Sequence, residues 1–214
     1  MRVILLGAPG AGKGTHSQFI ADRYNIPQIS SGNILRSAIL RNDKVAITIK
    51  QDMENGKLVS DEIVIKLIKD HIVKNKYEKK FLLDGFPRTI HQANAMKNIG
   101  IIIDYVLELY ISNEMITDRI IGRCMHASSG RVYHIKFNPP KIPNIDDITG
   151  EQLIVRNDDR KEAIYNRLNE YHNLTIPLIS YYQNEAIIGI VKYFKLNANQ
   201  TIFQIRKDLI NILG

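Results

Sequence analysis

Short apolar runs alternate with longer amphipathic segments along the chain. The runs RVILL, FLLD, YVLEL and VKYFKL are typical of parallel strands buried on both faces, and they occupy 2–6, 81–84, 105–109 and 191–196. Between them, apolar residues recur at helical spacing, which predicts helices over 13–24, 89–98, 113–122, 160–188 and 201–213. This alternation indicates an α/β fold in which helices cover both faces of a parallel sheet.

A serine marks the expected start of one further helix. Ser60 is followed by Asp61 and Glu62, so its hydroxyl can cap the helix while the two acids lie in the first turn. The apolar face expected for this helix consists of Ile63, Val64, Leu67, Ile68 and Ile72.

The segment 160–188 is the longest of the expected helices and contains a proline. Pro177 has no backbone N–H to donate, so it should kink the helix. The residues expected along its apolar face are Ile164, Leu168, Tyr171, Leu174, Leu178 and Tyr181.

Two stretches break the alternation of strand and helix. Residues 30–59 have a helical pattern with no strand, and residues 122–159 combine glycines and prolines with short β-like runs. We therefore expect a core, made of 1–29, 60–121 and 160–214, with two inserted subdomains.

The composition narrows the classes of function. The formal net charge is +7, which suits either a nucleic acid or a site for several phosphates, although many lysines fit a solvated helix face. Aromatic residues do not alternate with the basic ones, which argues against nucleic acid as a partner. No apolar run is long enough to span a membrane, and the single Cys124 excludes an internal disulfide, so we expect a cytoplasmic protein.

The segment GAPGAGKGT contains the spacing of a phosphate-binding loop. Gly7, Gly12 and Lys13 follow the pattern G-x-x-x-x-G-K between an expected strand and an expected helix. Glycines let successive backbone N–H groups point at one anion, and the lysine reaches the terminal phosphates. The usual motif has Ser or Thr directly after the lysine, whereas here Gly14 stands there and Thr15 follows, which puts a direct hydroxyl ligand to Mg²⁺ in doubt.

Further charged residues lie at the ends of expected elements. Asp84 ends a buried strand, where its carboxylate could hold Mg²⁺ through water or could instead cap the next helix. Any one arginine alone would be read as a surface ion pair, but phosphoryl transfer needs positive charge around the transferred group. The arginines concerned are Arg36, Arg88, Arg119, Arg123, Arg156 and Arg167.

Six motifs together resemble the adenylate kinase family, in particular its bacterial members with a long lid. These are GAPGAGKGT, PQISSGN, GKLV, LLDGFPRTIHQA, GRVYHIKFNPPK and RNDD. They span the whole chain with the family's spacing, and LLDGFPRT with GRVYH is the specific part. The resemblance implies a P-loop nucleoside monophosphate kinase fold with a five-stranded parallel sheet, an AMP-binding subdomain at 30–59 and a lid at 122–159. The implied reaction is transfer of a phosphoryl group from ATP to AMP, giving two ADP, with Mg²⁺ and in a monomer.

The resemblance also implies roles for individual residues. ATP would be bound by Gly10, Ala11, Gly12, Lys13, Gly14, Thr15, Arg119, Arg123, Val132, Tyr133 and Gln200. AMP would be bound by Ser31, Arg36, Lys57, Val59, Gly85, Arg88, Gln92, Arg156 and Arg167. The expected catalytic set is Lys13, Arg88, Arg123, Arg156, Asp158, Asp159 and Arg167.

Some positions depart from the family pattern. Ser31 replaces a threonine and keeps its hydroxyl, and Asn33 replaces an acid. Cys124 stands where a basic or small residue is common, and we interpret it as an inert small residue. Gln200 replaces a lysine near the adenine of ATP, which is harmless if the family contact uses the backbone carbonyl. Phe86-Pro87 resembles a cis peptide of the family.

Gln92 is the residue that bears on which monophosphate is accepted. A carboxamide offers one acceptor and one donor and can therefore read the N1 and N6 edge of adenine. A kinase for UMP, CMP or a small alcohol is the nearest alternative. A switch protein with a phosphate loop is a more distant one, because it would need a guanine-reading motif, which the sequence lacks.

Four lid residues occupy the places where zinc-binding relatives carry cysteines or an acid. They are His126, Ser129, Asp146 and Thr149. Serine and threonine hydroxyls are poor zinc ligands, so two good ligands are too few for a closed structural site. We expect instead a metal-free cluster joined by hydrogen bonds, the alternative being four unrelated surface residues.

Overall fold

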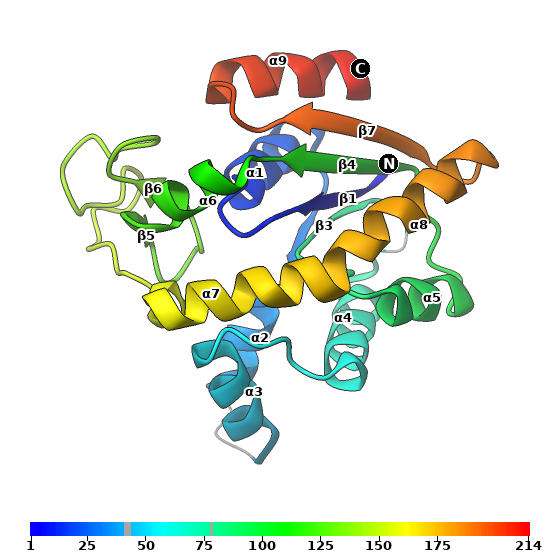
Figure 1. The fold of residues 1–214 in the computed structure, drawn as a ribbon, viewed down its shortest axis with the longest axis horizontal. Helices are drawn as coiled ribbons and strands as arrows, with labels where there is room; N and C mark the ends of the chain where they lie inside the picture. Colours follow the sequence, from blue (N-terminus) through cyan, green and yellow to red (C-terminus); the bar gives the residue numbers. More distant parts are fainter. Residues whose placement is uncertain (41–43, 78) are drawn as a thin grey trace.

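The computed structural model describes residues 1–40, 44–77 and 79–214, and its centre is a parallel sheet (Figure 1). The sheet has five strands in the order β2-β3-β1-β4-β7, which confirms the predicted α/β class. Their bounds are β1 Arg2–Gly7, β2 Gln28–Ser30, β3 Phe81–Asp84, β4 Tyr105–Tyr110 and β7 Lys192–Asn197.

Helices flank the sheet on both sides. In Figure 1, α9 lies on one side of the strands and α4, α5 and α8 gather on the other. The helices are α1 Lys13–Tyr24, α2 Ser31–Ile39, α3 Lys44–Glu54, α4 Asp61–Asn75, α5 Ile90–Asn98, α6 Asn113–Ile120, α7 Lys161–Glu170, α8 Ile176–Ile187 and α9 Ile202–Leu213.

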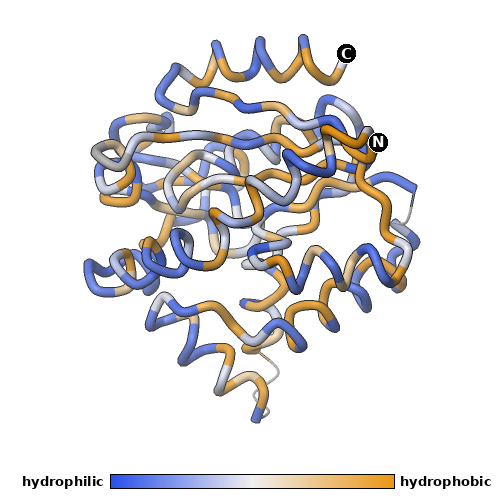
Figure 2. Tube along the Cα trace, turned by 45° about the vertical axis from the view of Figure 1, so that its right-hand side comes forward, coloured by the Kyte–Doolittle hydropathy of each residue, from blue (hydrophilic) through white to orange (hydrophobic). Residues whose placement is uncertain are grey.

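The core forms two layers, one on each face of the sheet. Successive side chains of a strand point to opposite faces. Val3 and Leu5 of β1 therefore pack in a different cluster from Ile4 and Leu6, although all four are buried. Figure 2 shows the matching pattern on α9, where hydrophobic positions face the sheet and hydrophilic ones face outward. Burial on both faces explains why β1 is a continuous apolar run.

The connections between successive strands run in opposite directions on the two sides of β1, at the centre of the sheet. β1 pairs with β3 on one side and with β4 on the other. The connection that leaves β1 runs to β2 on the β3 side, whereas the connection that leaves β3 crosses β1 to reach β4 on the other side. Ligands of open parallel sheets bind outside the carboxyl ends of the strands at such a point. Gly7 ends β1 there, and Asp84 of β3 and Ser30 of β2 are register partners close to it.

Two segments extend from this carboxyl end. The first corresponds to the predicted helical insertion and contains α2 and α3, while residues 41–43 lie outside the described residues. The second, residues 122–159, is called the lid segment below. It contains the antiparallel pair β5 Arg123–Met125 and β6 Val132–His134, and the arrowheads of β4 and β7 in Figure 1 point toward it.

Two local features differ from the sequence predictions. The strand β2 was missed, because three residues with Ile29 as the only fully buried one give no readable pattern. Ser60 does occupy the position before α4, but its side chain makes no capping hydrogen bond. The prediction that its hydroxyl caps this helix is therefore wrong.

The long C-terminal helical segment contains a π-helical turn, Tyr171–Thr175, between α7 and α8. The axis changes direction there in Figure 1, ahead of Pro177, which lies in the first turn of α8. A wider turn moves the following residues around the helix. Thr175 is consequently buried, whereas Leu174, which the spacing placed on the apolar face, is 41% exposed.

Candidate active site

The phosphate loop occupies the turn between β1 and α1. Gly12 precedes the helix with a φ of 87°, a left-handed conformation that a side chain disfavours. Because Gly12 has no side chain, the first backbone N–H groups of α1 receive no side-chain cap. These N–H groups, at the positive end of the helix dipole, are suited to hold an anion.

Lys13 is held next to this anion site by backbone carbonyls. Its Nζ donates hydrogen bonds to the oxygens of Gly7 at 2.6 Å and Ala8 at 2.9 Å. Burial, together with neighbouring guanidinium groups, lowers the pKa of Lys13 from its ordinary 10.5 to about 7, although the carboxylate of Asp84 opposes this. A phosphate would offset this loss of solvation and would therefore favour the charged ammonium group.

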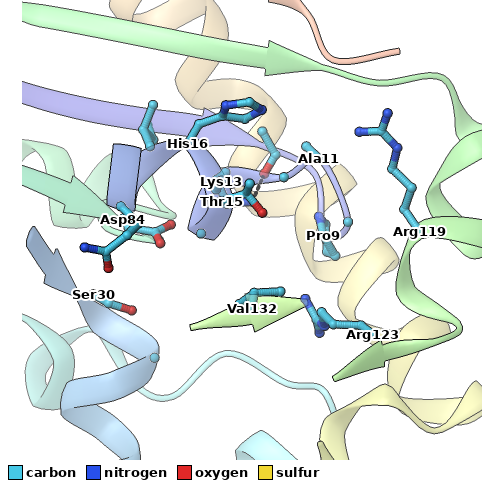
Figure 3. Close-up of a pocket in the computed structure, with 18 of the residues that line it drawn as sticks. Pro9, Ala11, Lys13, Thr15, His16, Ser30, Asp84, Arg119, Arg123 and Val132 are labelled. Carbon is cyan, nitrogen blue, oxygen red and sulfur yellow. Dashed lines mark hydrogen bonds between the residues drawn. The ribbon is translucent and has the colours of Figure 1, made fainter. Parts of the chain in front are cut away.

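A cavity of about 1260 Å³ opens beside the loop. Figure 3 shows Arg119 and Arg123 on one side of the loop, Asp84 and Ser30 on the other, and Val132 of the lid segment facing it. All residues that the sequence assigned to ATP line this cavity, namely Gly10, Ala11, Gly12, Lys13, Gly14, Thr15, Arg119, Arg123, Val132, Tyr133 and Gln200.

A second, smaller cavity of about 60 Å³ adjoins the first. Arg88, Arg156 and Arg167 line both, so the two cavities meet at these arginines. The other residues assigned to AMP that line the smaller cavity are Ser31, Lys57, Val59, Gly85 and Gln92. Arg36, which was also assigned to AMP, lines the larger cavity.

Gln92 is buried and bonded within the protein. Its Oε1 accepts from the backbone N–H of Arg88 at 2.7 Å, and its Nε2 donates to Asp61 at 2.7 Å. These bonds fix the orientation of the carboxamide. Each end keeps one further hydrogen-bonding position, since an amide oxygen has two lone pairs and an amide nitrogen has two protons.

Arginines and aspartates form an ion-pair cluster between the lid segment and α7. Arg123 Nε donates to Asp159 at 2.8 Å, and each residue makes a second contact to the other. Arg156 Nε donates to Asp158 at 2.8 Å in a similar two-point arrangement. Arg167 of α7 contacts both carboxylates, at 3.3 Å from Asp158 and 3.1 Å from Asp159.

Burial and neighbouring charges shift the pKa values of groups in this cluster and of Arg36. Burial would raise the pKa of Asp158, but the guanidinium of Arg156 outweighs it and holds this pKa well below the usual range. Burial, with Arg123 next in size, lowers the pKa of Arg167. Burial also lowers the pKa of Arg36 to about 10. Anionic oxygens placed among these groups would relieve the crowding of positive charge.

Positive charge exceeds negative charge around the two cavities. The Lys and Arg side chains that line the cavities are Lys13, Arg23, Arg36, Lys57, Arg88, Arg119, Arg123, Arg131, Lys136, Arg156, Arg167 and Arg206. The carboxylates that line the cavities are fewer, namely Asp22, Asp84, Asp158 and Glu170. A net positive site of this kind suits ligands that carry several phosphates.

Asp84 is the candidate for holding a divalent cation. It lines the cavity at the end of β3, across from Thr15 of the loop. Mg²⁺ is commonly bound by one or two carboxylates together with substrate phosphates and water, so the donor set here fits Mg²⁺ that arrives with ATP. No cluster of three or more His, Cys, Asp or Glu side chains placed to hold a metal was found in the described part of the chain.

Hydrogen bonds link the four lid residues singled out in the sequence. His126 Nδ1 lies 2.7 Å from Ser129 Oγ, and His126 Nε2 lies 3.3 Å from Thr149 Oγ1. Thr149 Oγ1 donates in turn to Asp146 at 2.9 Å. The chain of contacts therefore joins residues from two separate lid loops.

Three residues that the sequence analysis did not connect with this cluster extend it. Arg131 donates to Asp146 at 2.9 and 2.7 Å, and these bonds hold the pKa of the carboxyl well below its usual range. The hydroxyl of Tyr133 donates to Asp146 at 3.0 Å, and Glu151 contacts His126. They were missed because the zinc pattern of relatives marks only the four ligand positions.

Comparison with protein families gives a match to the adenylate kinase model over residues 5–187. The chain belongs to the adenylate kinase family. Its members are nucleoside monophosphate kinases, so this protein is a nucleotide-binding phosphotransferase. The family match covers every residue that lines the smaller cavity and most of those that line the larger one, the exceptions lying between Asn199 and Arg206.

Two residues in the wall of the larger cavity have no role assigned by the adenylate kinase motifs. His16 and Arg206 line the larger cavity beside Arg119 and Gln200. Among the residues that the structure describes, His16 Nδ1, Arg119 Nε, Gln200 Oε1 and Arg206 Nε are buried without a hydrogen-bond partner. His16 directly follows the loop motif in the sequence, and this position could have indicated a place in the site. Arg206 on α9 lies near no motif, so nothing in the sequence pointed to it.

No described helix is long and apolar enough to cross a membrane.

Proposed function

We propose that this enzyme transfers the terminal phosphoryl group of ATP to AMP and so forms two molecules of ADP. The observation that carries the proposal is the meeting of the two cavities at Arg88, Arg156 and Arg167. A donor phosphate on the loop and an acceptor phosphate in the smaller cavity would come together at these guanidinium groups. Phosphoryl transfer between two nucleotides needs this arrangement, because catalysis consists largely of positioning and charge stabilisation.

On the donor side, the loop N–H groups and Lys13 would hold the ATP phosphates. Lys13 would leave the carbonyls of Gly7 and Ala8 for phosphate oxygens, because those oxygens carry more negative charge. Arg123, Arg156 and Arg167 would stabilise the charge that develops during transfer, with Asp158 and Asp159 keeping them in position. Arg119 and Gln200 would border the nucleoside.

On the acceptor side, Arg88 would bind the phosphate of AMP and Gln92 would contact its adenine. Arg88 is anchored by a 2.8 Å bond from its Nε to Gly85, which leaves its terminal nitrogens for phosphate oxygens. The remaining donor and acceptor of Gln92 match the N1 and N6 edge of adenine. Ser31, Arg36, Lys57 and Val59 would complete the acceptor site.

Mg²⁺ bound with ATP would neutralise phosphate charge in this site. Asp84 would hold the ion through water, as its place in the cavity wall allows. We propose no zinc in the lid segment, since two of the four positions there carry hydroxyl groups.

We also propose that the lid segment closes over the nucleotides during each turnover. Val132 lies close enough to the loop that a Cβ at Gly14 would be 3.4 Å from its side chain. Closure would exclude water, which could otherwise hydrolyse the donor, and would bring Arg123 and Arg156 to the phosphates. We expect a monomer in the cytoplasm, with neither nucleic acid nor membrane as a partner.

A panel of acceptors tests the reaction directly. With ATP fixed, we expect rapid formation of ADP with AMP and at least about 100-fold slower reaction with CMP or UMP. The smaller cytosine ring would hold its N3 and N4 edge farther from the carboxamide of Gln92, and uracil presents a donor and an acceptor in the reverse order. Preference for CMP or UMP would make the enzyme a pyrimidine nucleotide kinase. Hydrolysis of ATP without any acceptor preference would overturn the proposal.

A further inference from the structure

A chain of hydrogen bonds leads from the edge strand of the sheet to the carboxylate of Asp84. Gln28 of β2 donates from Nε2 to the hydroxyl oxygen of Ser17 at 2.6 Å. The Ser17 hydroxyl lies 3.2 Å from Asp84 Oδ2 and 3.1 Å from the carbonyl oxygen of Gly14. Ser17 itself is fully buried on α1, behind the loop.

The number of protons available on Gln28 and Ser17 determines which group donates in each of these hydrogen bonds. A hydroxyl has one proton to donate, and Gln28 already supplies the hydrogen bond that Ser17 accepts. The single proton of Ser17 can therefore go either to Asp84 or to Gly14. Because a hydrogen bond to a charged acceptor is stronger than one to a neutral carbonyl, an ionised Asp84 draws the proton to itself.

We propose that Ser17 and Gln28 are positioning residues that orient the Asp84 carboxylate for the hydrated magnesium ion of the donor nucleotide. By occupying Oδ2, Ser17 fixes the rotation of the carboxylate and leaves the other oxygen for metal-bound water. Gln28 fixes the Ser17 hydroxyl in turn and also lines the cavity. The inference rests on the proposed function, since it assumes Asp84 as the magnesium residue.

The test compares the variants Ser17→Ala and Gln28→Met with wild type and with Ser180→Ala, an exposed serine on α8. Mn²⁺ affinity of the enzyme–ATP complex is measured by electron paramagnetic resonance, and the Mg²⁺ dependence of turnover is measured separately. We expect metal affinity to fall about ten-fold in both variants. A loss of this size is typical when a residue that hydrogen-bonds to a metal-binding side chain is removed. Affinity for metal-free ATP and the KM for AMP should stay at the wild-type values, and Ser180→Ala should match wild type throughout.

The double variant Ser17→Ala/Gln28→Met separates positioning from general damage. If the two residues act in one chain, the double variant should lose no more metal affinity than either single variant. In Ser17→Ala alone, the amide of Gln28 loses its hydrogen-bond acceptor, whereas the double variant removes both groups. The double variant can therefore be tested in folded form even if Ser17→Ala is unstable. Wild-type metal affinity in folded variants, or an equal loss of metal-free ATP binding, would overturn the inference. Failure of the wild-type enzyme to form ADP from ATP and AMP would instead refute the proposed function.

Discussion

Arg123 and Asp159 lie at opposite ends of the lid segment and form a two-point ion pair with each other, with Nε of Arg123 2.8 Å from Asp159 Oδ2. The side chains are largely buried, so the pair is poorly screened by solvent. The pair closes the base of the lid segment and places a guanidinium group beside the cavity at the same time. Arg167 contacts the same carboxylate at 3.1 Å, which connects this base to the core.

Removing the charge of Lys13 should stop phosphoryl transfer and leave the fold intact. Lys13→Met keeps the length of the side chain but loses the ammonium group that would stabilise negative charge on the phosphates during transfer. The kcat should therefore fall at least about 100-fold. Steady-state kinetics and circular dichroism measure the two effects. Near-normal turnover in a folded variant would contradict the assignment of this loop to the donor phosphates.

Nucleotide binding should take up a proton at Lys13. Burial sets the pKa of Lys13 to about 7, so at pH 8 most of the unliganded enzyme has a neutral lysine, and bound phosphates should restore its charge. Calorimetry of ATP binding in buffers of different ionisation enthalpy should show this uptake at pH 8 and less of it at pH 6. Lys13→Met should lack it, which distinguishes Lys13 from titration of the nucleotide itself.

The same shift has a consequence for stability, with a definite sign. The unfolded chain keeps the Lys13 proton up to about pH 10.5, whereas the folded chain releases it near pH 7. Between these values the unfolded state binds more protons, so this group makes the unliganded protein more stable as pH rises. Denaturant unfolding at pH 7 and pH 9 should show a steeper rise for wild type than for Lys13→Met.

Arg88 should discriminate between the two nucleotides. Arg88→Ala removes a charged hydrogen-bond donor from the acceptor phosphate, so the dissociation constant of AMP should rise about 10- to 100-fold while that of ATP changes little. Titration of each nucleotide alone gives both constants. Equal weakening of the two would mean that Arg88 does not belong to the acceptor side.

Gly130 offers a test of lid closure with a matched control. A Cβ at Gly130 would lie 2.7 Å from the Asn33 side chain of α2, so Gly130→Ala should obstruct the closed arrangement and lower kcat about ten-fold. Gly150 has nearly the same backbone strain, with φ of 74° against 73°, but a Cβ there meets nothing within 4 Å. Gly150→Ala should therefore share any loss of lid stability and keep its activity. Equal activity of the two variants would argue against closure onto α2.

Tyr133 should stabilise the lid segment locally. Its buried hydroxyl donates to Asp146 and accepts from the backbone of Asp147, each at 3.0 Å, so Tyr133→Phe should cost about 1 kcal/mol in the lid. Hydrogen exchange should then become about five-fold faster for lid amides and remain unchanged in the sheet.

Elemental analysis of protein purified without chelator tests the metal-free cluster of the lid segment. Stoichiometric zinc in this protein would refute it.

The sequence predicted best where a single pattern decides the structure. Burial on both faces makes 81–83 an unbroken apolar run, and the predicted bounds, 81–84, coincide with β3. Glycine spacing likewise located the loop before α1. Ser17 and Gln28 could not be found in this way, because the hydrogen bonds from Gln28 to Ser17 and from Ser17 to Asp84 join three separate elements of the fold. The exposure of Leu174 could not be foreseen either, since the π-helical turn shifts a regular spacing by one residue.

That turn also determines where the chain can accept insertions and deletions. Thr175, the last residue of the turn, donates from its hydroxyl to the backbone oxygen of Arg88 at 3.0 Å, so the wider turn connects α8 to the proposed acceptor site. Deleting one residue from the turn would restore ordinary helical geometry and rotate α8 by about 100° relative to α7. Leu178 and Tyr182 would then leave the core. Related sequences that vary in length should therefore do so in the lid segment or in loops, and rarely between Tyr171 and Thr175.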